Sequence, residues 1–179
     1  MFEKQYIGHV THGSKIKRAV WNCTCLVLFR PFGTKLFRLW RLLLLKIFGA
    51  EVAWSAEVYA SSKIWAPWLL TMEENSCIGP HTIVYNQARV TLHRQACLSQ
   101  YAYICTAGHE TNDVNNATKG LVVAEVLLEE GAWVGTRAFV GQGVIIGKHA
   151  VVGACACVFK DVPESMVVGG NPAQVIRSL

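Results

Sequence analysis

The side chain in this chain that is best suited to acid–base chemistry is that of His109. It lies within residues 105–121, a stretch of small and polar residues without the regularly spaced aliphatic residues found on both sides of it. Segments of this composition form loops, and loops carry function more often than regular elements do. An imidazole has a pKa near ~6.5, so it can accept a hydroxyl proton at neutral pH and return it to a leaving group. We therefore expect either a catalytic base here or a solvated loop histidine.

Cys105 raises a second chemical route because it lies only four residues before His109. A cysteine thiolate can form a covalent acyl intermediate. Direct attack by a hydroxyl needs no such intermediate, and Cys105 directly follows Ile104, which the repeat described below places inside the fold. We favour the direct route. The group that orients the imidazole stays open, because Glu110, Asp113 or a backbone carbonyl would serve.

The remaining histidines and the cysteines show no metal-binding pattern. Three histidines occupy ordinary repeat positions and are expected to be solvated: His81, His93 and His149. Seven cysteines are present, and two pairs of them are two residues apart, which is not the CxxC spacing of a zinc site. These pairs are Cys23/Cys25 and Cys155/Cys157. We predict free, mostly buried thiols and no metal.

The sequence around the loop has a six-residue period. In the second half of the chain an aliphatic anchor returns at every sixth position: Val122, Leu128, Val134, Val140, Ile146, Val152 and Val158. A glycine follows five hydrophobic anchors, at Gly79, Gly135, Gly141, Gly147 and Gly153. A period of six fits neither an α-helix nor simple strand alternation, so the unit is one short strand and one corner. Three units make one turn of a solenoid, in which the glycines allow close backbone approach.

The same pattern extends upstream in a modified form. Its anchors form triplets that restart after eight residues: Val52, Val58 and Ile64, then Met72, Ile78 and Val84, then Leu92, Leu98 and Ile104. Two extra residues therefore recur at one corner of each early coil, near residues 68–70 and 88–90. The gap from Ile104 to Val122 is eighteen residues, one full turn, and contains the His109 loop.

Length and composition fit a single domain with a long, thin core. The chain has 179 residues, 52% of them hydrophobic, and a net charge of +5. We expect a helical segment at residues 1–50, a repeat region at 51–163 and a tail at 164–179. Basic residues concentrate before Lys46, and the repeat region is close to neutral, which argues against nucleic acid binding. Residues 1–13 contain no apolar core of a secretory signal, so a cytoplasmic protein is expected.

The segment before the repeats predicts two amphipathic helices, at about residues 14–29 and 34–48. The second helix has a broad apolar face and is too short and too charged to span a bilayer. One interpretation is a cap over the open base of the solenoid. The other is an interfacial segment at residues 14–48, with arginines toward anionic headgroups and Trp40 at the boundary. The second interpretation adds peripheral contact with the inner face of the plasma membrane, and both can hold.

Several motifs resemble those of the hexapeptide-repeat acyltransferases. They are the repeats, the loop Cys105-Thr-Ala-Gly-His-Glu110, the stretch Gly131-Ala-Trp-Val-Gly135, and the tail Lys160-Asp-Val-Pro163 with Gly170-Asn-Pro-Ala173. Further segments resemble the colanic acid type of sugar O-acetyltransferase: Trp21-Asn22, Phe29-Arg30-Pro31, Ile64-Trp65-Ala66-Pro67-Trp68 and Tyr85-Asn86. The resemblance covers nearly the whole chain.

The resemblance implies a mainly β fold, a left-handed parallel β-helix of hexapeptide repeats behind the N-terminal pair of amphipathic helices. It also implies a homotrimer with active sites between subunits. The implied reaction moves an acetyl group from acetyl-CoA to a hydroxyl of a sugar, free or lipid-linked, in bacterial exopolysaccharide or capsule synthesis. His109 would be the general base of a direct ternary-complex mechanism.

Further residues take roles from the family by position. The residues matched to coenzyme contacts are Trp133, Thr136, Ala154, Lys160 and Arg177, with the two cations near the nucleotide phosphates. Tyr85 and Asn86 match positions expected to contact the acceptor sugar. An alternative role for Trp133 is packing at the trimer interface. An alternative role for Asn86 is a structural one, at a corner of a coil. Phe159 and Gln174 depart from the family pattern, so some coenzyme contacts are expected to be shifted.

Other functions stay open at this point. A trimeric carbonic anhydrase needs three histidines on adjoining faces to hold its metal, and the histidine spacing here does not supply them. In a non-catalytic solenoid scaffold, the loop would project from the wall without a catalytic role. An acetyltransferase could also act on a non-sugar acceptor such as serine, an amine or an antibiotic, or use a longer acyl donor.

Overall fold

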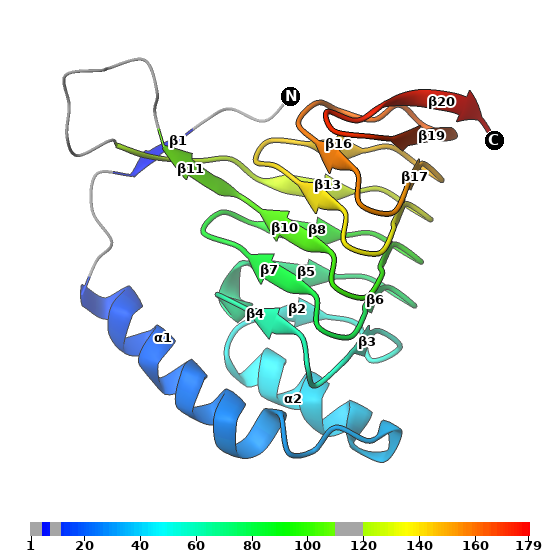
Figure 1. The fold of residues 1–179 in the computed structure, drawn as a ribbon. Helices are drawn as coiled ribbons and strands as arrows, with labels where there is room; N and C mark the ends of the chain where they lie inside the picture. Colours follow the sequence, from blue (N-terminus) through cyan, green and yellow to red (C-terminus); the bar gives the residue numbers. More distant parts are fainter. Residues whose placement is uncertain (1–4, 8–11, 110–119) are drawn as a thin grey trace.

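The computed structural model describes residues 5–7, 12–109 and 120–179. Three parallel β-sheets form the walls of a prism, and two helical segments lie across its base (Figure 1). The left-handed parallel β-helix, with about five turns, and the N-terminal pair of helices are both confirmed.

The chain visits the three walls in turn. The first wall contains β2 (Glu51–Val52), β5 (Leu70–Met72), β8 (Val90–Leu92), β13 (Val126–Leu128) and β16 (Ile145–Ile146). The second wall contains β3 (Glu57–Val58), β6 (Cys77–Ile78), β9 (Cys97–Leu98), β14 (Trp133–Val134), β17 (Val151–Val152), β19 (Met166–Gly169) and the antiparallel β20 (Gln174–Ser178). The third wall contains β4 (Lys63–Ile64), β7 (Ile83–Tyr85), β10 (Tyr103–Cys105), β15 (Phe139–Val140) and β18 (Cys157–Val158). A separate antiparallel sheet contains β1 (Gln5–Ile7), β11 (Ala107–His109) and β12 (Leu121–Val123).

The anchors of the repeat stack into one continuous core. In the third wall, Ile104 pairs in register with Val84 on one side and with Val140 on the other, and all three are fully buried. Their sequence neighbours face outward, as Ile83 and Tyr85 do beside Val84. Burying one such aliphatic side chain stabilises a fold by roughly 1.5–3 kcal/mol. The column of anchors is therefore the main source of cohesion.

One predicted wall anchor is wrong. Val122 fits the six-residue spacing and is buried, but it lies in β12, where it pairs with Gly108 in the antiparallel sheet. The walls resume at β13, where Leu128 pairs with Leu92 and Ile146. A period records which residues are buried, but it does not record which strand they pair with.

The glycines after the anchors allow the next coil to approach. A Cβ placed on Gly135 would lie 2.7 Å from the carbonyl oxygen of Val152 and 2.9 Å from the nitrogen of Ala154. No side chain fits at that distance. The predicted close backbone approach is confirmed at this position.

The helices close the base of the prism. Helix α1 (His12–Thr24) continues into a π-helical turn, η1 (Cys25–Phe29), and η2 (Lys35–Phe37) leads into α2 (Arg38–Ile47). Trp21, Leu42 and Leu45 belong to the same buried core as the anchors. The helices thus cover the base in the way that the cap interpretation describes. Among the described residues, no helix is long and apolar enough to cross a membrane.

The first coil has no coil beneath it, so the helices supply donors to its open carbonyls. Three such bonds run from Trp21 Nε1 to Ile64 O (2.8 Å), from Arg38 Nη1 to Ala56 O (2.8 Å) and from Arg41 Nε to Val58 O (2.8 Å). Arg41 is buried and also pairs with Glu57 at 3.2 Å. The expectation that the α2 arginines reach toward headgroups is wrong for Arg38 and Arg41, because unpaired backbone carbonyls need partners. Trp40 likewise donates to Leu28 O at 2.8 Å, which ties α2 to η1.

The cysteines are free, as predicted, but they are not mostly buried. Cys23 and Cys155 are exposed and the other five are half-buried. The wall cysteines stand at outward-facing positions beside buried anchors, as Cys97 does beside Leu98. Among the histidines predicted to be solvated, His93 keeps an accessible side chain, and its Nδ1 also lies 2.8 Å from a carboxylate oxygen of Glu73.

Candidate active site

His109 is the last residue of β11, in a short antiparallel arm that leaves the prism at one corner. Strand β11 pairs with β12, with His109 opposite Leu121, and β12 pairs on its other side with β1. The arm connects β10 with β13, so it stands at the corner between the third and first walls (Figure 1). Cys105, at the start of the predicted loop 105–121, belongs to the wall strand β10. Glu110 and Asp113 lie outside the described residues.

Thr106 fixes the root of this arm. Its side chain is fully buried, and its Oγ1 accepts hydrogen bonds from the backbone nitrogens of Gln87 (2.8 Å) and Ala88 (2.9 Å). Its own nitrogen donates to Tyr85 O at 3.1 Å, and its carbonyl accepts from Ala124 N at 3.0 Å. The hydroxyl therefore joins the arm to the two-residue insertion of the coil below.

Asn86 has a similar role in the coil below Thr106. Its side chain is fully buried, its Oδ1 accepts from Ala66 N at 3.0 Å, and its Nδ2 donates to Ala66 O at 2.7 Å and Leu69 O at 3.0 Å. These bonds hold η3 (Pro67–Leu69), the insertion of the first coil. Both amide hydrogens are used, and the side chain does not reach the surface. The structure thus gives Asn86 the corner role and not the sugar contact that the motif suggested.

The His109 side chain is exposed, and the strand that carries it is packed from above by Gln142. A Cβ on Gly108 would lie 3.2 Å from both amide atoms of Gln142, so a larger residue at this position would have to displace the Gln142 side chain slightly. Sequence reasoning missed Gln142 and Thr106, because neither residue type is unusual in a loop. The arrangement offers an imidazole to solvent from a strand that is anchored at its root and along its length.

Three of the residues matched to coenzyme contacts, Trp133, Thr136 and Ala154, lie along another edge of the prism. Trp133 faces outward from β14, is 48% exposed, and donates from Nε1 to Ser99 Oγ at 2.7 Å. Thr136 and Ala154 lie at the corner between the second and third walls, in successive coils. The Thr136 carbonyl accepts from Cys155 N at 2.9 Å, so the main chain at this edge is held in place. The structure therefore brings Trp133, Thr136 and Ala154 together.

Lys160 and Arg177 lie near the C-terminal end of the solenoid. Lys160 is exposed and lines a cavity of about 340 Å³ together with Phe159 and Gln174, the two residues that depart from the family pattern. Arg177 lies on β20 and donates to the carbonyl of Ser178 at 3.0 Å. Both cations are available to an anionic ligand, but no contact joins them.

Within one chain, the His109 arm and Trp133 lie on opposite sides of the third wall. From Thr136 to Gln142, which packs on the arm, the chain runs six residues, or up to roughly 20 Å when extended. Hydrogen-bond reach for a general base is about 3 Å. The arm and Trp133 thus lie at opposite edges of the third wall of one chain.

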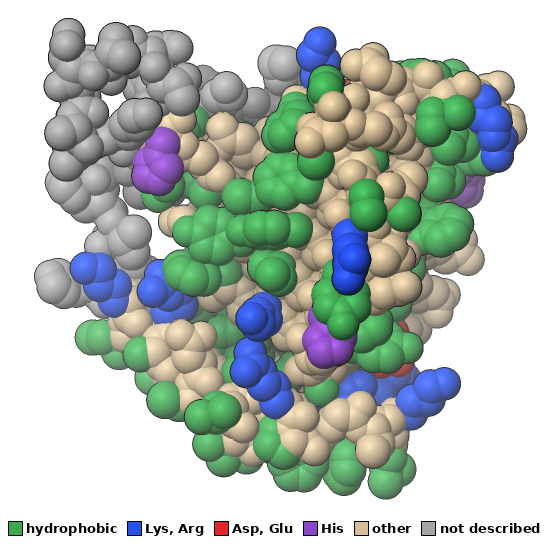
Figure 2. All heavy atoms as spheres, viewed as in Figure 1, with side chains coloured by type: hydrophobic (Ala, Val, Ile, Leu, Met, Phe, Trp, Pro, Cys, Tyr) green, Lys and Arg blue, Asp and Glu red, His purple; other side chains and the backbone are tan. Residues whose placement is uncertain are grey.

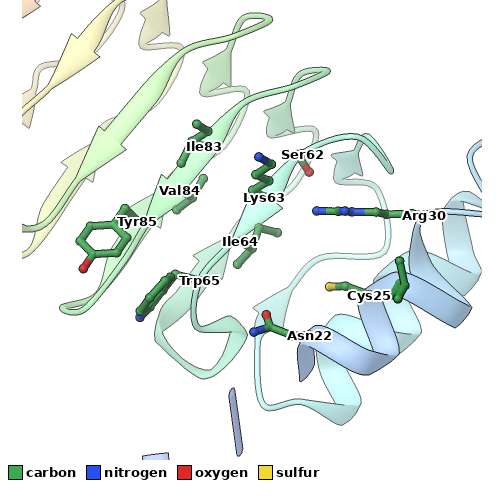
Figure 3. A pocket seen from close by; sticks show the side chains of 11 residues that line it. Asn22, Cys25, Arg30, Ser62, Lys63, Ile64, Trp65, Ile83, Val84 and Tyr85 are labelled. Carbon is green, nitrogen blue, oxygen red and sulfur yellow. The ribbon is translucent and has the colours of Figure 1, made fainter. Parts of the chain in front are cut away.

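Tyr85 borders a second cavity, of about 460 Å³, between η1 and the third wall. Its ring lies 4.7 Å from that of Trp65, centroid to centroid, and its hydroxyl accepts from Gln87 Nε2 at 2.6 Å. Arg30 and Lys63 extend toward this cavity from opposite sides, and its lining contains no carboxylate (Figure 3). Nothing in the sequence marks Arg30 or Lys63 as cavity residues, because their proximity depends on how the helices dock.

Solved structures confirm the fold. The hexapeptide-repeat-containing acetyltransferase VCA0836 from Vibrio cholerae matches with a TM-score of 0.83 at 23% identity, over 96% of both chains. A galactoside acetyltransferase solved with coenzyme A matches with a TM-score of 0.75 at 18% identity, over 97% of this chain and 86% of that one. At these identities the likeness shows the fold, which is the β-helix of acetyltransferases.

Sequence relatives define the family. No model of a known protein family matches the chain. The Escherichia coli (strain K12) protein WcaF, which its name assigns to colanic acid biosynthesis as an acetyltransferase, is 34% identical over 168 residues, covering 92% of this chain and 88% of the relative. This chain therefore belongs to the hexapeptide-repeat acetyltransferases. The predicted class, an acetyltransferase that uses acetyl-CoA, is confirmed at the level of the family.

Proposed function

We propose that this protein is an O-acetyltransferase that moves an acetyl group from acetyl-CoA to a hydroxyl of a sugar, with His109 as general base. The observation that carries the proposal is the exposed imidazole at the end of an anchored strand, in a chain that belongs to the acetyltransferase family. The solved complexes of VCA0836 with acetyl-CoA and of a galactoside acetyltransferase with coenzyme A support the donor.

The reaction requires two transfers of one proton, first to the imidazole and then to the leaving thiolate. His109 accepts the proton of the sugar hydroxyl while the hydroxyl oxygen attacks the thioester carbonyl carbon. A carbon–oxygen bond forms, the carbon–sulfur bond breaks, and the coenzyme thiolate takes the proton back from the imidazolium. Such general acid–base catalysis contributes typically 10²–10⁴-fold. Cys105 is held in the wall, where its Sγ lies 3.1 Å from Ala107 O, so a direct transfer is favoured over an acyl-cysteine.

The active site is shared between copies of the chain. The separation of His109 from Trp133 within one chain supports this, because a second copy can place its arm beside the first copy's Trp133. Contacts of this head-to-tail kind close into rings, and the family resemblance favours a homotrimer. Outward-facing aromatic rings on the third wall give such contacts an apolar surface, with Tyr103 and Phe139 5.5 Å apart and Phe139 and Phe159 5.7 Å apart.

The acceptor is a sugar unit of an exopolysaccharide or capsule, assembled on the cytoplasmic side of the membrane. The name of the Escherichia coli relative supports this assignment. Tyr85, with its ring on Trp65 and its hydroxyl at a cavity, is the proposed acceptor contact. Lys160 and Arg177 are proposed to meet the phosphates of the coenzyme, and Thr136 and Ala154 its pantetheine arm.

Two histidines allow a matched test of this function. The protein is incubated with acetyl-CoA and a panel of nucleotide sugars and lipid-linked saccharides, and thiol release and product mass are followed. His109→Asn is compared with His149→Asn, an exposed corner histidine with φ of 57°, a conformation that asparagine tolerates. We expect turnover to fall at least ~100-fold in the first variant only. Near-normal turnover of His109→Asn would remove the proposed mechanism.

A further inference from the structure

The two helices at the base of the prism are apolar on both sides. Their inner side chains, such as Trp21, Leu42 and Leu45, fill the core. Their outer side also carries a row of apolar residues: Ile16, Val20, Leu26, Val27, Leu36, Leu39, Leu43 and Ile47, all exposed. We call this second surface the base face.

The base face follows helical spacing. In α2, Leu39, Leu43 and Ile47 are four residues apart and lie on one side of the helix, with Ile47 67% exposed. Leu36, just before α2, is 85% exposed. A surface helix of a globular protein normally buries one apolar stripe and shows polar residues to solvent. A second contiguous apolar stripe indicates a surface that contacts a further partner.

The charges around the base face identify the partner. From Lys4 to Ala50 the sequence contains no Asp or Glu. Lys15, Lys17, Arg30 and Lys35 are exposed in this segment. Figure 2 shows hydrophobic side chains along the lower edge of the molecule, where α1 and α2 lie, with Lys and Arg side chains above them. That order of layers fits a lipid surface, with acyl chains below and anionic headgroups above.

We propose that the base face docks onto the surface of an anionic lipid bilayer. The leucines and isoleucines enter the boundary of the acyl chains, and the lysines meet the headgroups. A second copy of the chain fits less well, because base-to-base contact would oppose two sets of cations without a carboxylate between them. The helices stay on the surface, because Arg41 and Trp21 tie them to the first coil.

Vesicle sedimentation tests the proposal on the full-length protein. Phosphatidylcholine vesicles are compared with vesicles that also contain phosphatidylglycerol, at low and high salt. We expect binding to the anionic vesicles, reduced by salt, and a loss of at least ~10-fold in Leu39→Ser/Leu43→Ser/Ile47→Ser. Lys15→Glu/Lys35→Glu should lose the preference for anionic vesicles.

A matched control comes from the other end of the solenoid. Val175 and Ile176 are 58% and 66% exposed on β20, so Val175→Ser/Ile176→Ser removes similar apolar surface and should leave binding unchanged. Circular dichroism and thermal unfolding check that each variant is folded, and the triple-serine variant should keep its turnover on a water-soluble acceptor. Equal binding of the triple-serine variant and the wild type would overturn the proposal. Absence of vesicle binding by the wild type would also overturn it, and self-association that is lost in the triple-serine variant would then assign the base face to a second copy.

Discussion

Thr106 and Asn86 occupy the same corner of two successive coils, and both are fully buried polar residues that bond to the main chain of the insertion one coil below. Thr106 Oγ1 accepts a hydrogen bond from the main-chain nitrogen of Gln87, and Asn86 Oδ1 accepts one from that of Ala66. The corner that carries the His109 arm is thus built on a column of side-chain to main-chain hydrogen bonds. These hydrogen bonds fix the point at which the arm leaves the prism.

The first prediction follows from this column. Thr106→Val keeps the shape of the side chain but removes the acceptor for Gln87 N and Ala88 N. Leaving such groups unpaired costs about 1–3 kcal/mol of unfolding free energy, and the arm should lose its position. Urea unfolding and the kcat for acetyl transfer are measured. Thr106→Ser keeps the hydroxyl and is the control; a valine variant that equals it in both measurements would contradict the role of the hydroxyl.

Lys160 provides a prediction on coenzyme affinity. The Lys160 ammonium is exposed beside a cavity, where it can form a charge-assisted hydrogen bond to a phosphate. Lys160→Ala should raise KM for acetyl-CoA about ten-fold and leave kcat within a few-fold, since the lost contact does not change during reaction. Lys148→Ala is the control, because Lys148 pairs with Glu130 at 3.0 Å on a different corner. An unchanged KM would argue against the phosphate contact.

Two glycines differ in what surrounds them, and this gives a prediction on stability. A Cβ on Gly135 would lie 2.7 Å from the Val152 carbonyl oxygen, whereas a Cβ on Gly120 would meet nothing within 4 Å. Gly135→Ala must push two coils apart and should lower the free energy of unfolding by at least about 1–3 kcal/mol. Gly120→Ala should be nearly neutral. The comparison is made by urea unfolding, and equal stabilities would show that the coils have room to separate.

The walls could be predicted from the sequence because the repeat directly records burial. Each anchor, such as Ile104 or Val140, is aliphatic since its position faces the core, and the glycine after it is needed for backbone approach. Strand partners are not recorded in the same way. Val122 kept the spacing of an anchor while pairing in the arm with Gly108.

The site was only partly predictable for a related reason. His109 was recognisable by its unusual surroundings in the sequence. The roles of Thr106 and Gln142 depend on contacts between coils, which have no local signature. The sequence also did not show whether the Arg41 side chain points to the core or to solvent, because a helix that is apolar on both sides gives no indication of which side faces the core.

The thiol of Cys97 offers a prediction on pH dependence. A hydrogen bond from the Cys77 thiol, one coil away in register, stabilises the Cys97 thiolate and lowers the pKa of Cys97 to about 7. The same bond, together with burial, raises the pKa of Cys77. Alkylation of Cys97 should therefore rise with pH through a midpoint near 7, below the ordinary cysteine value of about 8.5. Mass spectrometry of iodoacetamide-treated protein measures this midpoint. Cys77→Ala should move it upward, and a midpoint that does not respond to Cys77 would contradict the pairing.

Mixed oligomers test whether the active site is shared between chains. His109→Asn removes the base, and Ala154→Glu places a carboxylate at an exposed position proposed to meet the coenzyme, so each variant alone should be inactive. In a mixture of the two, a shared site can combine the intact His109 of one chain with the intact Ala154 of its neighbour. In a homotrimer that contains both variants, one site in three has this composition, so about a third of wild-type turnover is expected from the mixed oligomers. Coexpression with two different affinity tags isolates the mixed oligomers, and purified variants pooled without coexpression are the control. If His109 and Ala154 acted within the same chain, no site would contain both, and the mixed oligomers would stay as inactive as their parents.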